Sequence, residues 1–230
     1  NHAHRVVRKA IHIVICRSAA SPLVTDNLIL CVQGTLPVIQ VDHLFLPGDS
    51  MEPKFKKLTD FLISIGVDQI KHTDKGYLAH AIGVHNDLRD WGCGSDLCRA
   101  AMFHSIYGTE FFQGFTLSLE RRGDVRDLIG ERAERLAYWN CAINRKAFDL
   151  AVQQDQPPHR LLDRFTDQYE EVTSSDFDDL CRIHLCDWLE QVPRSETWDY
   201  RRATYRGLAE KLGGIALESY ERVFALETAF

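Results

Sequence analysis

The spacing of the prolines constrains the fold of this chain more than any other feature of its sequence. Four of the seven prolines lie before residue 54, and no other follows until Pro157 and Pro158. A proline inside a helix costs about 3 kcal/mol, so a long proline-free block favours packed helices. The sequence therefore predicts a helical domain that begins near Pro53 and occupies residues 53–230.

Residues 1–52 differ in character and are predicted to form an N-terminal extension. Short β-branched runs at 11–16, 28–32 and 37–41 are separated there by turn sequences, which is typical of strands. The chain starts at Asn1 without a methionine, and the short apolar stretch near its start has no small-residue cleavage site. We therefore expect a fragment or processed product, with possible strand character in this extension.

Helical periodicity dominates the rest of the chain. Apolar residues recur at helical spacing from Lys54 to Ile65 and stop at Gly66, a plausible helix end. Similar patterns predict further helices over residues 74–90, 95–108, 124–140, 145–153, 175–191, 200–212 and 215–225. The expected fold is mainly all-α, a helical bundle.

Composition narrows the class of function. The chain is 45% apolar and carries a net charge of −6, so it has no general attraction for phosphate backbones or anionic lipid. No apolar run reaches the 18 to 20 residues of a membrane helix. The seven cysteines show no CxxC spacing, which favours reduced thiols. We expect a cytoplasmic protein that binds neither nucleic acid nor membrane.

The histidines of the helical domain are densest in one stretch, at His72, His80, His85 and His104. Helical residues are turned by about 100° each, so His80 and His85 point about 140° apart and cannot easily share an ion. Gly76 and Gly83 leave space beside His80 for a metal, a ligand or another helix. His104 follows an apolar stretch and should be buried, either as a hydrogen-bonded core residue or as a metal ligand.

An acidic residue also faces the predicted core. In the helix over 175–191, Asp187 shares a stripe with Leu180, Ile183 and His184, so its carboxylate should point inward and needs a partner. One possible partner is an arginine, and several are available: Arg99, Arg126, Arg132 and Arg135. The other is a metal ion held by two imidazoles and this carboxylate.

The order of these segments resembles a degenerate HD domain. His80 is followed by Ala100-Ala-Met-Phe-His104-Ser105, by the stretch 128–136, and by Leu185-Cys-Asp187-Trp-Leu189. The sequence is similar to the hydrolase domain of alarmone (ppGpp) synthetase/hydrolases, an all-helical metal-dependent phosphohydrolase fold, and to a little-characterised HD-like branch. The resemblance covers residues 55–195. It implies that His80, His104 and Asp187 are three of the four metal ligands.

The chain also departs from that family. Ser105 stands where the motif has an aspartate, and the acidic pair that follows in the alarmone hydrolases falls on Gly108 and Thr109. A two-metal site is then hard to assemble, unless one of three acidic residues compensates: Glu110, Asp87 or Glu134. We expect Glu134 to form an ion pair, because the resemblance places a structural residue there. Two histidines and one carboxylate suit a single ion with open positions.

Three hypotheses of function remain open. The first is a metal-dependent phosphohydrolase of a nucleotide or small phosphoester, with Glu110 or Asp87 as proton acceptor. The second is a non-heme iron oxygenase acting on a small organic substrate, on the same fold. The third is a catalytically inactive pseudo-HD scaffold or ligand-sensing module. The cofactor in the first two would be a divalent metal, Fe, Mn or Zn, and the partner a small molecule.

Overall fold

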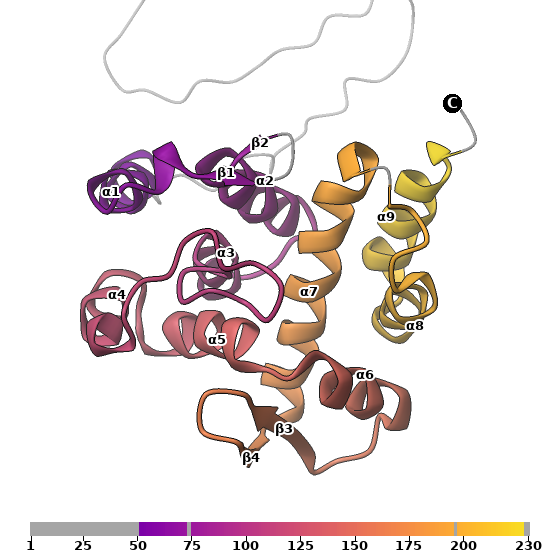
Figure 1. Cartoon of the computed structure of the whole chain (residues 1–230). Helices are drawn as coiled ribbons and strands as arrows, with labels where there is room; N and C mark the ends of the chain where they lie inside the picture. Colours follow the sequence, from indigo (N-terminus) through magenta and orange to yellow (C-terminus); the bar gives the residue numbers. More distant parts are fainter. Residues whose placement is uncertain (1–50, 73–74, 196, 228–230) are drawn as a thin grey trace, which may run out of the picture. The chain divides into compact units, whose positions relative to one another are not determined.

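Helices make up most of the structure, a computed structural model that describes residues 51–72, 75–195 and 197–227 (Figure 1). The α-helices of these residues are α1 Met51–Ser64, α2 Tyr77–Asp90, α3 Ser95–Met102, α4 Arg122–Ile129, α5 Glu131–Ala142, α6 Arg145–Gln154, α7 Ser174–Ser195, α8 Arg202–Leu212 and α9 Gly214–Phe224. Two short 3-10 helices accompany them, η1 Val67–Gln69 and η2 Leu119–Arg121. The prediction of a mainly all-α fold is confirmed.

Helix α7 lies at the centre of the arrangement. Helices α2, α3 and α5 pack against one side of it, and α8 and α9 against another (Figure 1). Thr173 caps its start, since its hydroxyl oxygen accepts the Asp176 backbone N–H over 3.1 Å. Most residues of α7 are buried, among them Leu180, Ile183 and His184. The inward stripe expected from the sequence is therefore buried, with Asp187 towards His80 and His104 and with His184 towards α6 and α8.

Two helices end earlier than the sequence patterns predicted. The pattern over 124–140 is divided at Gly130, whose φ of 95° ends α4 and begins α5; glycine adopts this conformation without a steric penalty. The pattern over 95–108 stops at Met102, and His104 lies in the turn that follows. The His104 ring bonds the Ala101 carbonyl, which helps to replace the helical ladder there.

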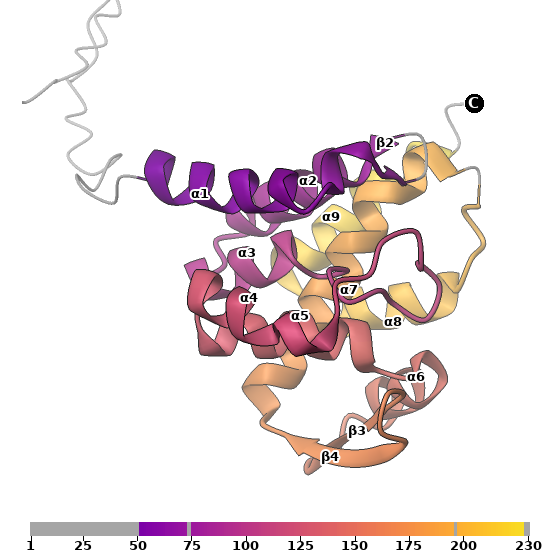
Figure 2. The ribbon, with the colours of Figure 1, turned by 60° about the vertical axis from the view of Figure 1, so that its left-hand side comes forward.

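The chain after α3 forms a long loop, residues 103–118, which lies beside α7 in both ribbon views (Figure 2). Its contacts reach distant segments: the Glu110 carboxylate accepts the Arg145 backbone N–H, and the ring of Phe111 meets that of Tyr200. The loop thus joins the region of His104 to the start of α6 and to the segment that precedes α8.

The sequence analysis missed two antiparallel hairpins. Strand β1 (Lys71–His72) pairs with β2 (Lys75–Gly76), and β3 (His159–Asp163) pairs with β4 (Gln168–Val172). In β3 the side chains alternate between buried and less buried positions, while β4 is mostly exposed. The strands expected at 11–16, 28–32 and 37–41 lie outside the described residues.

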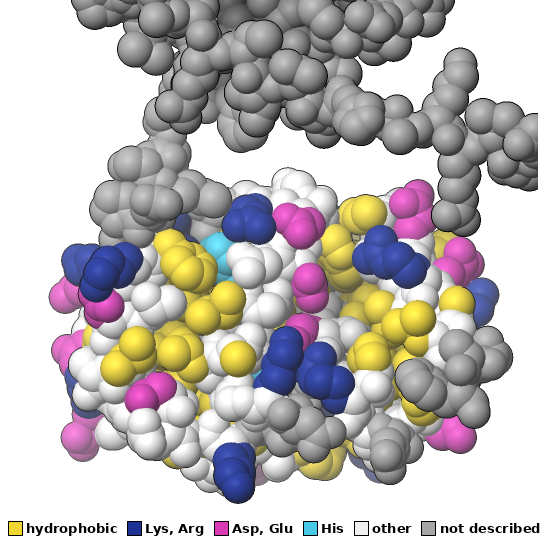
Figure 3. All heavy atoms as spheres, turned by 90° about the horizontal axis from the view of Figure 1, so that it is seen from above, with side chains coloured by type: hydrophobic (Ala, Val, Ile, Leu, Met, Phe, Trp, Pro, Cys, Tyr) yellow, Lys and Arg dark blue, Asp and Glu magenta, His cyan; other side chains and the backbone are white. Residues whose placement is uncertain are grey.

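On one face of the helical unit, hydrophobic and charged side chains gather in separate areas (Figure 3). Seen from the end that α1, α2 and α9 form, hydrophobic side chains gather over α1 and α2 and again over α8 and α9, with charged side chains between them (Figure 3). Ile63 of α1 and Ile215 of α9 are among the exposed large hydrophobic residues. In the described part of the chain, no helix is both long and apolar enough to cross a membrane.

Candidate metal centre

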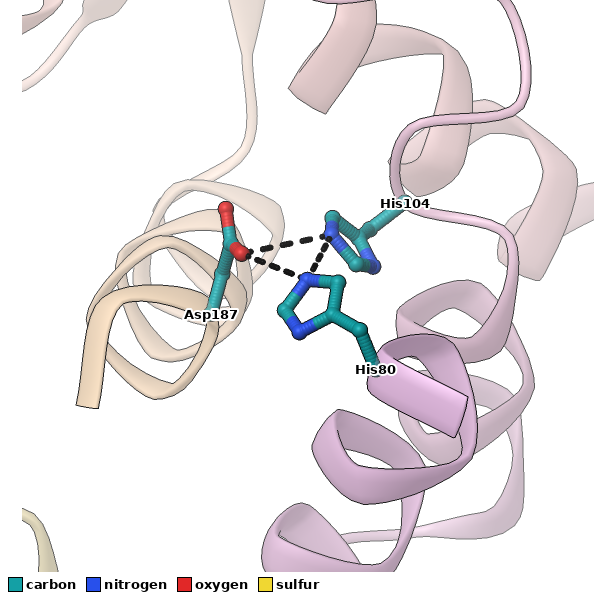
Figure 4. A group of neighbouring side chains, drawn as sticks. All are labelled: His80, His104 and Asp187. Carbon is teal, nitrogen blue, oxygen red and sulfur yellow. Dashed lines mark hydrogen bonds and ion pairs between the residues drawn. The ribbon is translucent and has the colours of Figure 1, made fainter. Parts of the chain in front are cut away.

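Three potential metal ligands converge where α2, the turn after α3 and α7 meet (Figure 4). The Nε2 atoms of His80 and His104 lie 3.2 Å apart. The Asp187 Oδ1 atom is 3.0 Å from Nε2 of His80 and 3.3 Å from Nε2 of His104. Both imidazoles are fully buried and the carboxylate is largely so. The structure therefore brings together the three residues that the resemblance proposed as ligands.

The other nitrogen of each ring is already engaged. The Nδ1–H of His104 donates to the Ala101 carbonyl over 2.6 Å, because a carbonyl oxygen can only accept. Nδ1 of His80 lies 2.5 Å from Oε2 of Glu190 and donates to that carboxylate. In neutral rings both Nε2 atoms then carry lone pairs, which face each other and the Asp187 oxygen. Three electron-rich atoms at this spacing require a cation between them, either a proton or a metal ion.

The spacing of the three atoms fits a single ion. Donors held about 2.1 Å from one metal lie about 3.0 Å apart at octahedral angles and about 3.4 Å apart at tetrahedral angles. The observed separations of 3.0, 3.2 and 3.3 Å fall within this interval. The contacts at Nδ1 also match metal centres, where a ligating histidine usually donates its second N–H to a carboxylate or a backbone carbonyl.

Glu190 is a supporting residue that the sequence analysis did not single out. Its buried carboxylate accepts from Lys75 over 2.6 Å and from Arg194 over 2.7 Å, besides holding His80. Burial alone would raise the pKa of Glu190, but the hydrogen bonds of His80 and Lys75 lower it. Glu190 therefore stays ionised, and its charge is balanced by two cations. A sequence signal existed, since Glu190 lies three residues after Asp187 on one helix face.

Gly83 explains how Glu190 can reach His80. A Cβ atom added at Gly83 would lie 2.8 Å from Oε1 of Glu190, closer than real Cβ contacts allow. The space that the sequence analysis expected beside His80 is thus filled by α7. A Cβ at Gly76, the other glycine noted there, would meet only the Ile70 carbonyl oxygen, at 3.8 Å.

The pKa values of the centre reflect the charges that surround it. Burial would lower the pKa of His80, but hydrogen bonds to Asp187 and Glu190 outweigh it and raise that pKa to about 9. Burial would raise the pKa of Asp187, yet His104 and His80 hold it well below its usual value. A proton and a metal ion would therefore compete for the same three atoms.

The two predicted proton acceptors lie away from the three donor atoms. Glu110 is exposed, and its carboxylate accepts the Arg145 backbone N–H over 2.7 Å. Asp87 lies on α2, seven residues after His80, and burial together with the charges of Glu190 and Asp90 raises its pKa. No contact joins either carboxylate to the donors within the described residues. Their catalytic roles stay predictions.

Glu134 forms the ion pair expected of it. Its fully buried carboxylate receives Nε of Arg122 over 2.7 Å and the hydroxyl of Tyr107 over 3.0 Å. His85 is separate from the centre, as its helical position predicted: its ring contacts Asn86 and the ring of Phe55. The side chain of His72 lies outside the described residues.

Comparison with known proteins gives one match. Residues 61–145 match the model of a family described as a domain of unknown function (DUF6817). The matched segment holds His80 and His104 and ends before Asp187. None of the curated proteins and none of the solved structures matches the chain.

Proposed function

We propose that the helical domain is an HD-like metal-dependent enzyme that hydrolyses a nucleotide or another small phosphoester, with His80, His104 and Asp187 as ligands of one divalent ion. The observation that carries the proposal is the convergence of the three donor atoms at 3.0 to 3.3 Å, with both Nδ1 groups engaged elsewhere. The order of the motifs along the chain supports the HD-like part of the proposal.

The protein's own residues prepare the centre. Glu190 orients the His80 ring and the Ala101 carbonyl orients the His104 ring, so neither ligand needs to rearrange on binding. The packed helices keep water away from both imidazoles, which strengthens electrostatic interactions there. When bound, a divalent ion would supply Lewis acidity towards a phosphoryl oxygen and make water a better nucleophile at neutral pH.

The ligand set also supports a second candidate function. Two histidines and one carboxylate with open positions are the ligands that non-heme Fe(II) oxygenases use. Within the described residues, the group that could hold an ion consists of His80, His104 and Asp187 alone. Ser105, at the position of the motif aspartate, supplies no carboxylate to bridge a second ion. A single Fe(II) ion acting on a small organic substrate is therefore the alternative proposal.

The metal content of the purified full chain tests the centre. We expect stoichiometric Fe, Mn or Zn by elemental analysis in the wild type, and its loss in His104→Ala. The matched control is His85→Ala, which removes another buried histidine outside the centre and should keep the metal. A wild type that folds normally, holds no metal and does not bind added Mn(II), Fe(II) or Zn(II) would contradict the proposal. The hypothesis of a catalytically inactive scaffold would then remain.

Two assays separate the reaction classes. Phosphate release from a panel of nucleotides by the Mn(II)-loaded protein would support the hydrolase, provided that His104→Ala abolishes it. Consumption of O₂ by the Fe(II)-loaded protein with candidate organic substrates, without phosphate release in the first assay, would instead support the oxygenase.

A further inference from the structure

A second buried histidine, His184 of α7, lies in an environment opposite to that of His80. Its Nδ1 atom is 2.5 Å from Nη1 of Arg145, and its Nε2 atom is 3.0 Å from Nη1 of Arg201. We call His184, Arg145 and Arg201 the arginine cluster. His184 and Arg145 are buried, at 2% and 6% exposed, and the side chain of Arg201 is 15% exposed.

Hydrogen-bond donors exceed acceptors in the arginine cluster. A guanidinium group only donates, whereas a neutral imidazole has one donor nitrogen and one acceptor nitrogen. A protonated imidazole has two donors. In the neutral ring one nitrogen carries a hydrogen, and in the protonated ring both do. At least one nitrogen of His184 therefore turns an N–H group towards an arginine N–H group. The cluster needs a further acceptor, which its own side chains do not supply.

Positive charge is only partly compensated there: the charge of Asp187 acts on Arg145 and His184, but Asp187 forms no ion pair with either. Arg201 has the carboxylate of Asp149 as its partner. Within the described residues no carboxylate lies in ion-pair distance of the Arg145 guanidinium, whose other contact is a long one, 3.4 Å, to the Asn140 carbonyl. Burial lowers the pKa of Arg145. A buried cation without an ion-pair partner is costly, so a position that keeps one points to an anionic ligand.

The arginine cluster lies next to the metal centre. His184 precedes Asp187 by three residues, about one helical turn, on the same face of α7. The Asn140 side chain donates to the His104 carbonyl over 2.8 Å, while the Asn140 carbonyl contacts Arg145. One residue of α5 therefore touches both groups.

Aromatic rings close the other side of the arginine cluster. Tyr205 of α8 stacks on His184, with ring centroids 5.5 Å apart, and Trp188 stacks on Tyr205 at 5.3 Å. The Arg201 guanidinium lies 5.2 Å from the centroid of the Tyr205 ring. These rings fix the positions of His184 and Arg201, so the donors of the cluster are held in place before a ligand arrives.

We propose that Arg145, supported by Arg201 and His184, binds an oxyanion group of the substrate, a phosphate or a carboxylate, beside the metal centre. That the anion belongs to a substrate rests on the proposed function; that the cluster binds an oxyanion does not. The planar guanidinium offers paired N–H groups that fit two oxygens of such an anion. The bound anion supplies both the acceptors and the negative charge that the cluster lacks.

Calorimetric titration of the full chain tests this proposal, with inorganic phosphate and acetate as separate probes. Each is titrated into metal-free and Mn(II)-loaded protein. We expect wild-type binding of at least one probe and a weakening of about tenfold or more in Arg145→Gln, as expected for lost charge-assisted hydrogen bonds. The control is Arg206→Gln, an equal charge change at an exposed arginine paired with Glu210, which should bind as the wild type does.

The outcomes separate this proposal from the proposed function. Arg145→Gln should still take up Mn(II), because Arg145 is not a ligand. A wild type that takes up Mn(II) but binds neither probe overturns the oxyanion site alone, and equal binding by wild type and Arg145→Gln overturns it too. A wild type that takes up no metal, yet binds phosphate or acetate through Arg145, overturns the metal centre alone.

A second variant covers the case in which Arg145→Gln does not fold. Arg145→Lys keeps the positive charge and loses the planar fork, so we expect anion binding between that of the wild type and none. Unchanged binding by a folded Arg145→Lys and by Arg201→Gln would overturn the assignment. A preference for phosphate over acetate would identify a phosphorylated substrate, and the reverse a carboxylate.

Discussion

His80 and His184 lie on neighbouring helices of one core, and their surroundings are chemical opposites. Both rings are buried, and both have a charged group at each nitrogen. His80 meets the carboxylates of Glu190 and Asp187, whereas His184 meets the guanidinium groups of Arg145 and Arg201. The pKa of His80 is raised to about 9, while burial and the two arginines hold the pKa of His184 well below its usual value.

The comparison shows that carboxylates surround one buried histidine and guanidinium groups surround the other. Protonation of His80 balances the carboxylates in the metal-free protein, whereas the arginine cluster keeps a buried positive charge without an ion-pair partner at Arg145, which is unfavourable. Together the two environments support the proposed metal ion and the proposed anionic ligand, one helical turn apart on α7. The following predictions, ordered from the largest expected effect to the smallest, test each half of this comparison.

Asp187→Asn should have the largest effect on metal binding. The substitution keeps the shape of the side chain and removes the only anionic ligand, so we expect Mn(II) affinity to fall on the order of 1,000-fold, or about 4 kcal/mol. Calorimetric titration with Mn(II) measures it. Asp178→Asn, which changes a half-exposed carboxylate of the same helix, is the control. Equal losses in both variants would remove Asp187 from the centre.

The stability of the metal-free protein should depend on pH through His80. Its pKa is raised from 6.5 to about 9 on folding, so the stabilisation is fully present below pH 6.5 and is lost as the pH rises to about 9. The expected loss of free energy of unfolding is about 3 kcal/mol. Urea denaturation at pH 6 and pH 9 measures it, and His80→Gln should remove the dependence. Mn(II) affinity should rise over the same interval, because the proton competes with the metal.

Glu190→Gln should weaken metal binding less than a change of ligand does. The amide oxygen can still accept from His80, but the charge that orients the ring and makes it a better ligand is lost. We expect a decrease of about 10- to 100-fold in Mn(II) affinity. Glu210→Gln on α8 is the matched control. If Glu190→Gln binds Mn(II) as tightly as the wild type, Glu190 supports the fold rather than the centre.

Arg145→Met should stabilise the protein when no ligand is present. The substitution replaces a buried cation that lacks an ion-pair partner with an apolar side chain of similar length, and such replacements can gain about 1 to 2 kcal/mol. Thermal unfolding in a buffer without oxyanions measures the gain. If Arg145→Met instead destabilises the protein in this buffer, the side chains of the arginine cluster already balance its charge and hydrogen bonds.

Gly83→Ala should have the smallest effect on stability. It should destabilise the protein, whereas its control should stabilise it. The added methyl group would displace the Glu190 side chain, at a cost of about 1 kcal/mol and with some loss of metal affinity. In Gly207→Ala, on α8, the new methyl group meets no neighbour within 4 Å and should stabilise the helix by about 0.5 to 1 kcal/mol. If Gly83→Ala and Gly207→Ala stabilise the protein to a similar degree, the close contact between Glu190 and α2 is not required.

Much of the centre was accessible from the sequence because its ligands follow local patterns. Helical periodicity placed Asp187 on the inward stripe of its helix, and the apolar residues before His104 predicted its burial. Gly130 shows the limit of such patterns: its neighbours are periodic on both sides, so only its φ of 95° reveals that two helices replace one. The β3–β4 hairpin was missed because one of its strands is almost wholly exposed and shows no alternation.

Arg145 had no usable signal in the sequence. It opens a predicted helix, where a charged residue is usually solvated, and nothing in its neighbours indicates burial without an acidic partner. Its environment comes from residues of α5, α7 and the loop over 103–118, which are distant along the chain.

By itself, the sequence determined the helical class of the domain and the inward position of Asp187, because helix formation and the inward stripe depend on periodicity within single segments. The set of three candidate ligands came from the resemblance to HD domains. The tertiary structure alone decided that three donor atoms meet within 3.3 Å. It also decided that Glu190 and the Ala101 carbonyl fix the rings of His80 and His104, and that His184 lies between two arginines. Such distances depend on how helices far apart in the chain pack, and no local pattern encodes them.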